Sequence, residues 1–164
     1  MPQTLHKAER LCRKKLIEEL FGGKARSFTS FPLRVVFLPV ADQPCPATIL
    51  VSVSKRRFKR AVKRNRVKRQ IREAYRLNKQ LLLPALQAQG QQLVIAFIYL
   101  SDKLLPTQQI QGQMRQILLR LSEQTQQQPV PQKLTHPQPM AQQPVQQQNA
   151  NQQSMQEQSM QEQQ

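Results

Sequence analysis

The sequence is poor in the residues with which most enzymes and metal proteins do chemistry. It has no Trp, two Cys and two His among 164 residues, and 9 acidic residues against 25 Lys and Arg. Cys12 and Cys45 form no C-x-x-C pair, and His6 and His136 lie near opposite ends of the chain, so no metal-ligand spacing is present. We therefore expect two unpaired thiols in a reducing compartment, and little catalysis by the chain's own side chains.

Long apolar segments are missing as well. The longest apolar run, Leu93–Leu100, covers eight residues and contains a Tyr, whereas a helix needs roughly 20 apolar residues to cross a bilayer. Met1 is not followed by a basic segment that leads into an apolar stretch, so no secretory signal is visible. These absences predict a soluble, cytoplasmic protein that does not enter a membrane.

Basic charge is what the chain has in excess, with a formal net charge of +16. A compact fold with this charge repels itself and attracts polyanions, so nucleic acid or an anionic membrane surface is the first partner to expect. Residues 124–164 carry one Lys and two Glu, a net charge of −1, which leaves +17 on residues 1–123. The basic character therefore belongs to the first 123 residues.

Composition changes abruptly near residue 124. The last 41 residues contain 18 Gln, five Pro and no aromatic residue. Such a segment cannot bury enough apolar surface to offset the entropy lost on ordering, and we expect it to be disordered. We predict an RNA-binding domain at 1–123 and a disordered tail at 124–164, which is more simply a dispensable extension than an interaction segment.

Hydrophobic periodicity predicts three helices in residues 1–123. The first covers Glu9–Phe21 and ends at Gly22-Gly23, and the second covers about Arg60–Leu82 and is closed by Pro84. Ser101 or Asp102 introduces the third. Its apolar stripe is formed by Ile110, Met114, Ile117, Leu118 and Leu121.

Four stretches read as strands, because they are rich in β-branched or apolar residues and most are bounded by turn residues. They cover Arg26–Thr29, Leu33–Leu38, Ala47–Ser54 and Leu93–Tyr99. The resulting order, α-β-β-β-α-β-α, predicts a small α+β sandwich in which helices cover a mostly four-stranded sheet.

The second predicted helix is intensely basic on one side. Residues 55–79 hold 13 of the 25 Lys and Arg and a single acid, Glu73. At 100° per residue, one side collects an apolar stripe made of Val67, Ile71, Ala74 and Tyr75. The other side collects six residues that we call the basic ridge: Asn65, Arg66, Lys68, Arg69, Arg72 and Arg76.

The bland interpretation of the basic ridge is a solvated charged face. Ordinary solvated helix faces mix Glu with Lys, whereas this one nearly lacks acids. Arg outnumbers Lys, and its planar fork suits bidentate contacts with phosphate. We therefore favour a phosphate-binding ridge, although this chemistry alone distinguishes RNA from DNA only weakly.

Several motifs resemble the bacterial ribonuclease P protein family. They are Ser52-Val53-Ser54-Lys55, Ala61-Val62-Lys63-Arg64-Asn65-Arg66-Val67-Lys68-Arg69 and Ile71-Arg72-Glu73-Ala74-Tyr75-Arg76. Upstream, Lys7-Ala8-Glu9-Arg10-Leu11 and Phe21 are similar to the family's first helix, so the resemblance covers residues 4–123. It implies the α-β-β-β-α-β-α order with a left-handed βαβ crossover.

The resemblance also implies a function. The chain would be the protein subunit of ribonuclease P, a ribonucleoprotein endonuclease whose RNA subunit carries the catalytic centre and most of the Mg²⁺. Its partners would be that RNA and precursor tRNA, whose 5′ leader is removed by hydrolysis; no protein oligomer is expected. RNA contacts are implied for Lys55, Arg56, Arg60, Arg64, Asn65, Arg66, Lys68, Arg69, Arg72 and Arg76, and a leader cleft for Ile17, Phe21 and Ser52. No catalytic residue or metal ligand is expected in the chain itself.

The sequence departs from the family pattern in two places. Arg57–Arg60 fills a stretch where the family usually has Gly, and Ile17 stands where many members have a second aromatic residue. Stacking on the leader could then come from Phe28 or Phe31 instead. Apart from the resemblance, Phe21 would be read as a core residue at a helix end.

Two other functions compete with this one. A general RNA- or ribosome-binding protein would share the basic composition without processing tRNA. A protein-only nuclease would need clustered carboxylates to hold Mg²⁺, and the seven acids of residues 1–123 are scattered along the sequence: Glu9, Glu18, Glu19, Asp42, Glu73, Asp102 and Glu123.

Overall fold

A computed structural model describes residues 4–41 and 43–126. Its elements are the 3₁₀ turn η1 (Lys7–Glu9), α1 (Lys14–Phe21), β1 (Arg26–Ser30), β2 (Leu33–Val40), β3 (Ala47–Val53), α2 (Ala61–Asn78), the 3₁₀ turn η2 (Lys79–Leu81), α3 (Leu83–Ala88), β4 (Gln92–Tyr99) and α4 (Thr107–Gln126). All four predicted strands are present, and the α+β class is confirmed.

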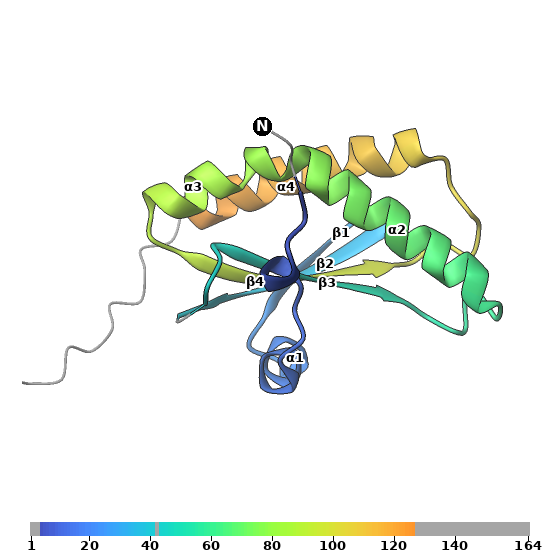
Figure 1. Cartoon of the computed structure of the whole chain (residues 1–164), viewed down its shortest axis with the longest axis horizontal. Coiled ribbons are helices and arrows are strands. Elements are labelled where there is room, and N and C mark those ends of the chain that lie inside the picture. The colour runs from blue at the N-terminus through green and yellow to red at the C-terminus, as the bar shows by residue number, and fades with distance from the viewer. Residues whose placement is uncertain (1–3, 42, 127–164) are drawn as a thin grey trace, which may run out of the picture. The chain divides into compact units, whose positions relative to one another are not determined.

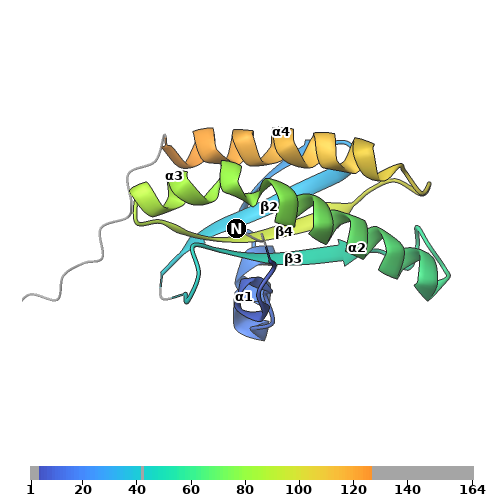
Figure 2. The ribbon, with the colours of Figure 1, turned by 45° about the horizontal axis from the view of Figure 1, so that its top comes forward.

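The strands form one sheet in the order β1-β2-β4-β3. β2 is antiparallel to β1 and to β4, whereas β3 runs parallel to β4 with Ala47 opposite Leu93 and Val53 opposite Tyr99. The crossover from β3 to β4 passes through α2 and α3 on one face of the sheet. In Figure 2 α2 lies nearer the viewer than the sheet, β3 and β4 both run to the right, and β4 lies above β3. This arrangement makes the crossover left-handed, as expected.

The helices lie on both faces of the sheet (Figure 1). α2, α3 and α4 cover one face, and α1 lies on the other. Alternation along β3 assigns its side chains to the two faces: Ile49 and Val51 join the core under α2 and α4, whereas Leu50 joins the smaller cluster on the α1 side.

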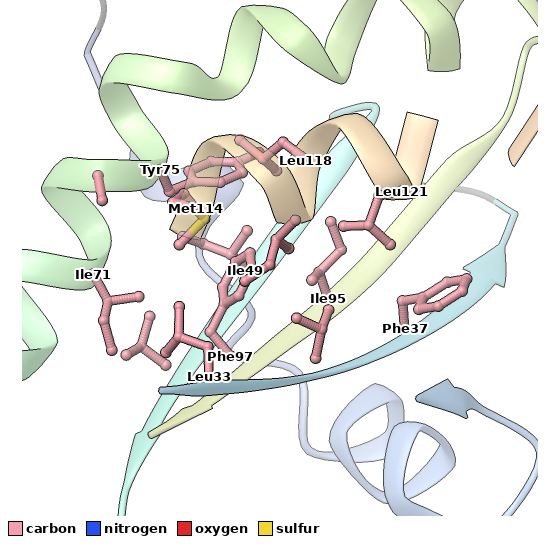
Figure 3. Packing of buried hydrophobic residues seen from close by; sticks show 14 of the residues in the cluster. Leu33, Phe37, Ile49, Ile71, Tyr75, Ile95, Phe97, Met114, Leu118 and Leu121 are labelled. Carbon is pink, nitrogen blue, oxygen red and sulfur yellow. The ribbon is translucent and has the colours of Figure 1, made fainter. Parts of the chain in front are cut away.

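The main core lies between the sheet and the α2–α4 pair (Figure 3). Both predicted apolar stripes are confirmed, because every residue of each is buried. In Figure 3, Tyr75 lies close to Met114 and Leu118, and its ring is 6.0 Å from that of Phe97. α2 is therefore held to the sheet and to α4 along its apolar side, which leaves the opposite side at the surface.

The first predicted helix starts too early. Leu11 donates its backbone N–H to the carbonyl of Ile49 at 2.9 Å, and Arg10 forms a parallel bridge with Ile49. This pairing with the edge of β3 keeps the chain extended, so α1 begins only at Lys14. The helical spacing of Leu16 and Leu20 correctly predicted α1, but it cannot show that the preceding residues are paired with a strand.

Pro84 does not close the second helix as predicted. α2 already ends at Asn78, where a 3₁₀ turn follows, and Pro84 stands in the first turn of α3. Proline is accepted there because first-turn N–H groups have no helical partner. The helix expected over Arg60–Leu82 is therefore α2 plus one further turn, and α3 was missed.

The last helix begins at Thr107 instead of Ser101 or Asp102. The N–H of Lys103 donates to Ser101 Oγ at 3.1 Å, and Tyr99 Oη donates to the Lys103 carbonyl at 2.8 Å. These bonds fold residues 101–103 into a turn that is tied to the end of β4. Ser101 thus caps a turn rather than a helix.

β2 also runs past its predicted end at Leu38 to Val40, through Pro39. β1 pairs only with Leu33–Phe37, so Pro39 needs no N–H for a partner strand on that side. α4 continues to Gln126, and the rest of the predicted tail lies outside the described residues. Among the helices of the described residues, none is long and apolar enough to span a bilayer.

Candidate nucleic-acid interface

The basic ridge lies on the side of α2 that faces away from the core. Asn65, Arg66 and Arg69 are exposed, and Lys68, Arg72 and Arg76 are half-buried. The opposite stripe is completely buried, with Val67, Ile71, Ala74 and Tyr75 at 0% exposure. Because α2 is fixed by that stripe, the cations of the ridge stand on a rigid support at the surface.

Part of the ridge lines a surface hollow of about 940 Å³. Arg69, Arg72 and Arg76 contribute to its wall, together with Gln70, Glu73, Thr107 and three residues of the N-terminal segment, Thr4, Leu5 and Arg10. The hollow contains four arginines and one glutamate, a net charge of +3. It is therefore a site that attracts anions.

Glu73, the one acid of this helix, is paired with Arg76. Arg76 Nε donates to Glu73 Oε2 at 2.9 Å, and its Nη2 donates to the other carboxylate oxygen. The hydrogen bond from Arg76 lowers the pKa of the Glu73 carboxyl. The single acid of this helix thus pairs with a cation of the basic ridge, and Arg76 is held in place by a carboxylate one turn earlier.

Arg64 has a different position from its neighbours. Its Nη1 donates to the carbonyls of Phe58 and Lys59 at 2.8 and 2.6 Å. The ring of Phe58 is buried and lies 6.1 Å from that of Tyr99. Arg64 thus fixes the loop that enters α2, in the stretch where the family glycine is missing, and Phe58 anchors that loop in the core.

The remaining predicted RNA contacts lie before α2. Lys55 and Arg56 are exposed in the turn after β3, and Arg60 is the exposed N-cap residue of α2. The N–H of Arg56 donates to Ser54 Oγ, which shapes this turn. These three cations extend the basic surface beyond the first turn of the helix and do not line the hollow.

The N-terminal segment was missed as part of this surface. Glu9 of this segment forms a 2.7 Å ion pair with Lys79, at the end of α2. Arg10 lines the hollow together with Arg69, Arg72 and Arg76 of α2. Periodicity could not reveal this, since it placed Glu9 and Arg10 in a helix.

The three predicted leader-cleft residues belong to the other face of the sheet. Ile17 packs into the cluster under α1, together with Leu50 and Ile98. Ser52 lies opposite Ile98 in the register, on the same face. Phe21, at the end of α1, is 51% exposed, so its interpretation as a core residue is wrong.

Phe28 cannot stack on a ligand at this face. It packs edge-on against Phe37 at 6.2 Å, and the Arg120 guanidinium lies 4.6 Å above its ring. Both contacts are on the side covered by α4. Phe31, in turn, is 60% exposed in the turn between β1 and β2.

Metal-binding side chains do not gather in the described part of the chain. No group of three or more His, Cys, Asp or Glu is close enough there to hold an ion. The ion-pairing of Glu9 and Glu73 with Lys79 and Arg76 shows what two of the acids do instead.

The sequence was compared with protein families and with known proteins. The Ribonuclease P family model matches residues 5–122. The ribonuclease P protein component of Porphyromonas gingivalis is 44% identical over 119 residues, which are 72% of this chain and 86% of that protein. The one from Chlorobaculum tepidum is 37% identical over 93 residues, 52% of this chain and 60% of that protein.

The fold has solved counterparts. The RNase P protein from Thermotoga maritima superimposes with a TM-score of 0.53 at 20% identity, over 68% of this chain and 96% of that one. The family match covers the sheet, α1 and the whole of the basic ridge. The chain belongs to the ribonuclease P protein family.

Proposed function

We propose that this chain is the protein subunit of a ribonuclease P ribonucleoprotein, which removes the 5′ leader from precursor tRNA. The observation that carries this proposal is the basic ridge on α2, mounted by a fully buried stripe within a chain of this family. The chain would contribute binding and orientation, and the RNA subunit would contribute the catalytic centre.

The RNA subunit would bind the basic ridge and the turn before it. Arg69 and Arg72 have no hydrogen-bond or ion-pair partner within residues 4–41 and 43–126, so their forks are available for phosphate oxygens. If six to ten phosphates are neutralised, affinity should fall roughly 10³–10⁵-fold between 50 and 200 mM salt. Counterion release of this kind holds an RNA strongly without reading its sequence.

The leader would bind on the other face of the sheet, beside α1. An exposed aromatic ring there can stack on an unpaired base, and Phe21 offers one. Ser52 and Ile17 flank the same face with a small hydroxyl and an apolar surface. With α1 on one side of the sheet and α2 on the other, one small protein can contact two RNA strands at once.

Mg²⁺ is proposed to act on the RNA subunit. We propose no metal ligand among the described residues, where no three candidate ligands lie close together. The cations of this chain would instead neutralise phosphates close to where the two RNAs meet, and this would favour their approach.

The test is reconstitution of purified chain, RNA subunit and precursor tRNA at physiological Mg²⁺. We expect efficient 5′ cleavage only when both RNA and protein are present. Cleavage by the protein alone would point to a protein nuclease. An RNA subunit whose cleavage is unaffected by the protein would leave a general RNA-binding protein as the better interpretation.

A further inference from the structure

A buried ion pair joins two segments that are 70 residues apart in the sequence. Lys79 Nζ lies 2.7 Å from Glu9 Oε1, and both side chains are only 9% exposed. Lys79 Nζ also donates to the Thr4 carbonyl at 2.7 Å, and the N–H of His6 donates to Glu9 Oε2 at 2.7 Å. The pair therefore holds the path of residues 4–9 by side-chain and backbone contacts alike.

Arg10 follows directly after this anchored segment. On its far side, Leu11 is fixed to the edge of β3 by the bond to the Ile49 carbonyl. Arg10 is thus held between two attachments, one to the end of α2 and one to the sheet. Its exposed side chain lines the same hollow as Arg69 and Arg72.

We propose that the Glu9–Lys79 ion pair is a positioning device that adds Arg10 to the phosphate-binding surface of α2. The inference rests on the proposed function, because it specifies how one RNA-binding surface is assembled from two segments. Glu9 and Lys79 are positioning residues, and Arg10 is the residue that meets a phosphate.

A geometric reason favours such a device at this place. Residues 4–10 contain no helix or strand long enough to fix a side chain by itself, since η1 is a single turn and the bridge from Arg10 to Ile49 holds the segment only at its C-terminal end. A guanidinium on a loose segment would lose its conformational freedom at the moment of binding, at the expense of affinity. Fixing the segment in advance removes that loss.

A double-mutant cycle tests the proposal with RNA-subunit affinity as the readout. Lys79→Met breaks the pair and keeps an apolar stem of similar length. In the unchanged background we expect Arg10→Ala to weaken binding roughly tenfold, the range of a lost charged hydrogen bond. It should also lower the salt slope by about 0.7–0.9. In the Lys79→Met background, Arg10→Ala should cause no further loss.

Arg69→Ala is the matched control, because Arg69 is carried by α2 and needs no help from Glu9. Arg69→Ala should weaken RNA-subunit binding by the same factor in both backgrounds. A purely structural role of Lys79 would change both arginines alike. Equal losses from Arg10→Ala in the two backgrounds would overturn the proposal, and so would no loss in the unchanged chain.

Two further measurements keep the outcome clear. Trypsin cleavage after Lys7, measured against cleavage after Lys103, should accelerate in Lys79→Met without RNA present. If circular dichroism shows that this variant does not fold, Glu9→Gln takes its place in the cycle. Absence of any binding between the unchanged chain and the RNA subunit would refute the proposed function itself, separately from the role of the ion pair.

Discussion

Arginines that look equivalent in the sequence have different tasks in the structure. Arg64 donates to two loop carbonyls, Arg76 is paired with Glu73, and Arg69 faces solvent on the basic ridge. Their spacing in one basic motif gives no indication of this division. It depends on which atoms of neighbouring segments lie within reach of each guanidinium.

Arg64→Ala should therefore affect stability more than Arg69→Ala. Removing Arg64 leaves the Phe58 and Lys59 carbonyls without their donor and should lower the free energy of unfolding by about 1–2 kcal/mol. An exposed surface change such as Arg69→Ala should stay within about 0.5 kcal/mol. Urea unfolding of the two variants measures the difference, and equal values would contradict the role of Arg64 in the loop.

Tyr75 gives a prediction about alkaline pH. Burial raises the pKa of its hydroxyl, with a smaller contribution from Glu9, whereas the unfolded chain titrates at about 10. The unfolded state thus loses its proton first, so stability is intact below about pH 10 and falls as the pH rises further. Tyr75→Phe should reduce this loss of stability at alkaline pH.

The same substitution should be harmless or favourable at neutral pH. Tyr75 Oη is buried without a hydrogen-bond partner among the described residues. Removing such a hydroxyl should raise the free energy of unfolding by about 1 kcal/mol. Thermal unfolding of Tyr75→Phe at pH 7 and pH 11 checks both parts, and a variant less stable than the parent at both values would refute them.

At the scale of elements, α1 and α2 present different chemistry on opposite faces of the sheet. α2 offers cations, and α1 ends in the exposed ring of Phe21. If Phe21 stacks on the leader, Phe21→Ala should weaken binding of precursor tRNA by roughly tenfold, within the range for one stacked base. Binding of leaderless tRNA should not change.

Phe31→Ala is the matched control for that prediction, since Phe31 is about as exposed but lies in the turn between β1 and β2. Affinities for tRNA with and without a leader, measured in the reconstituted complex, separate the two rings. If Phe31→Ala instead of Phe21→Ala weakened binding, the leader would stack at the turn between β1 and β2, and the prediction for Phe21 would be wrong.

The elements whose pattern is set by burial could be predicted from the sequence. The four strands and the apolar stripes of α2 and α4 follow from side chains that alternate or recur at helical spacing. The helix ends could not, because distant partners decide them: Ile49 holds Leu11 extended, and Ser101 is used in a turn. The basic ridge could be predicted because its residues recur at helical spacing. The hollow that Arg10 completes could not, because it depends on a contact between two distant segments.

At the scale of the whole molecule, the two predicted regions differ sharply in charge. The excess of basic residues lies within 1–123, and residues 127–164 are rich in Gln and carry almost no charge. We predict that deleting residues 127–164 leaves RNA-subunit affinity within about twofold and leaves 5′ cleavage intact. A tenfold loss in either assay would assign the tail a part in RNA binding.

The central claim is that RNA binds the outer face of α2. Its most direct measurement is the slope of the logarithm of RNA-subunit affinity against the logarithm of salt concentration. The Arg69→Ala/Arg72→Ala variant is compared with the Lys14→Ala/Lys24→Ala variant, which loses the same charge near the two ends of α1. We predict a slope reduced by about 2 in magnitude for the first pair and an unchanged slope for the second. Equal slopes for both variants and the parent chain would show that the RNA binds elsewhere.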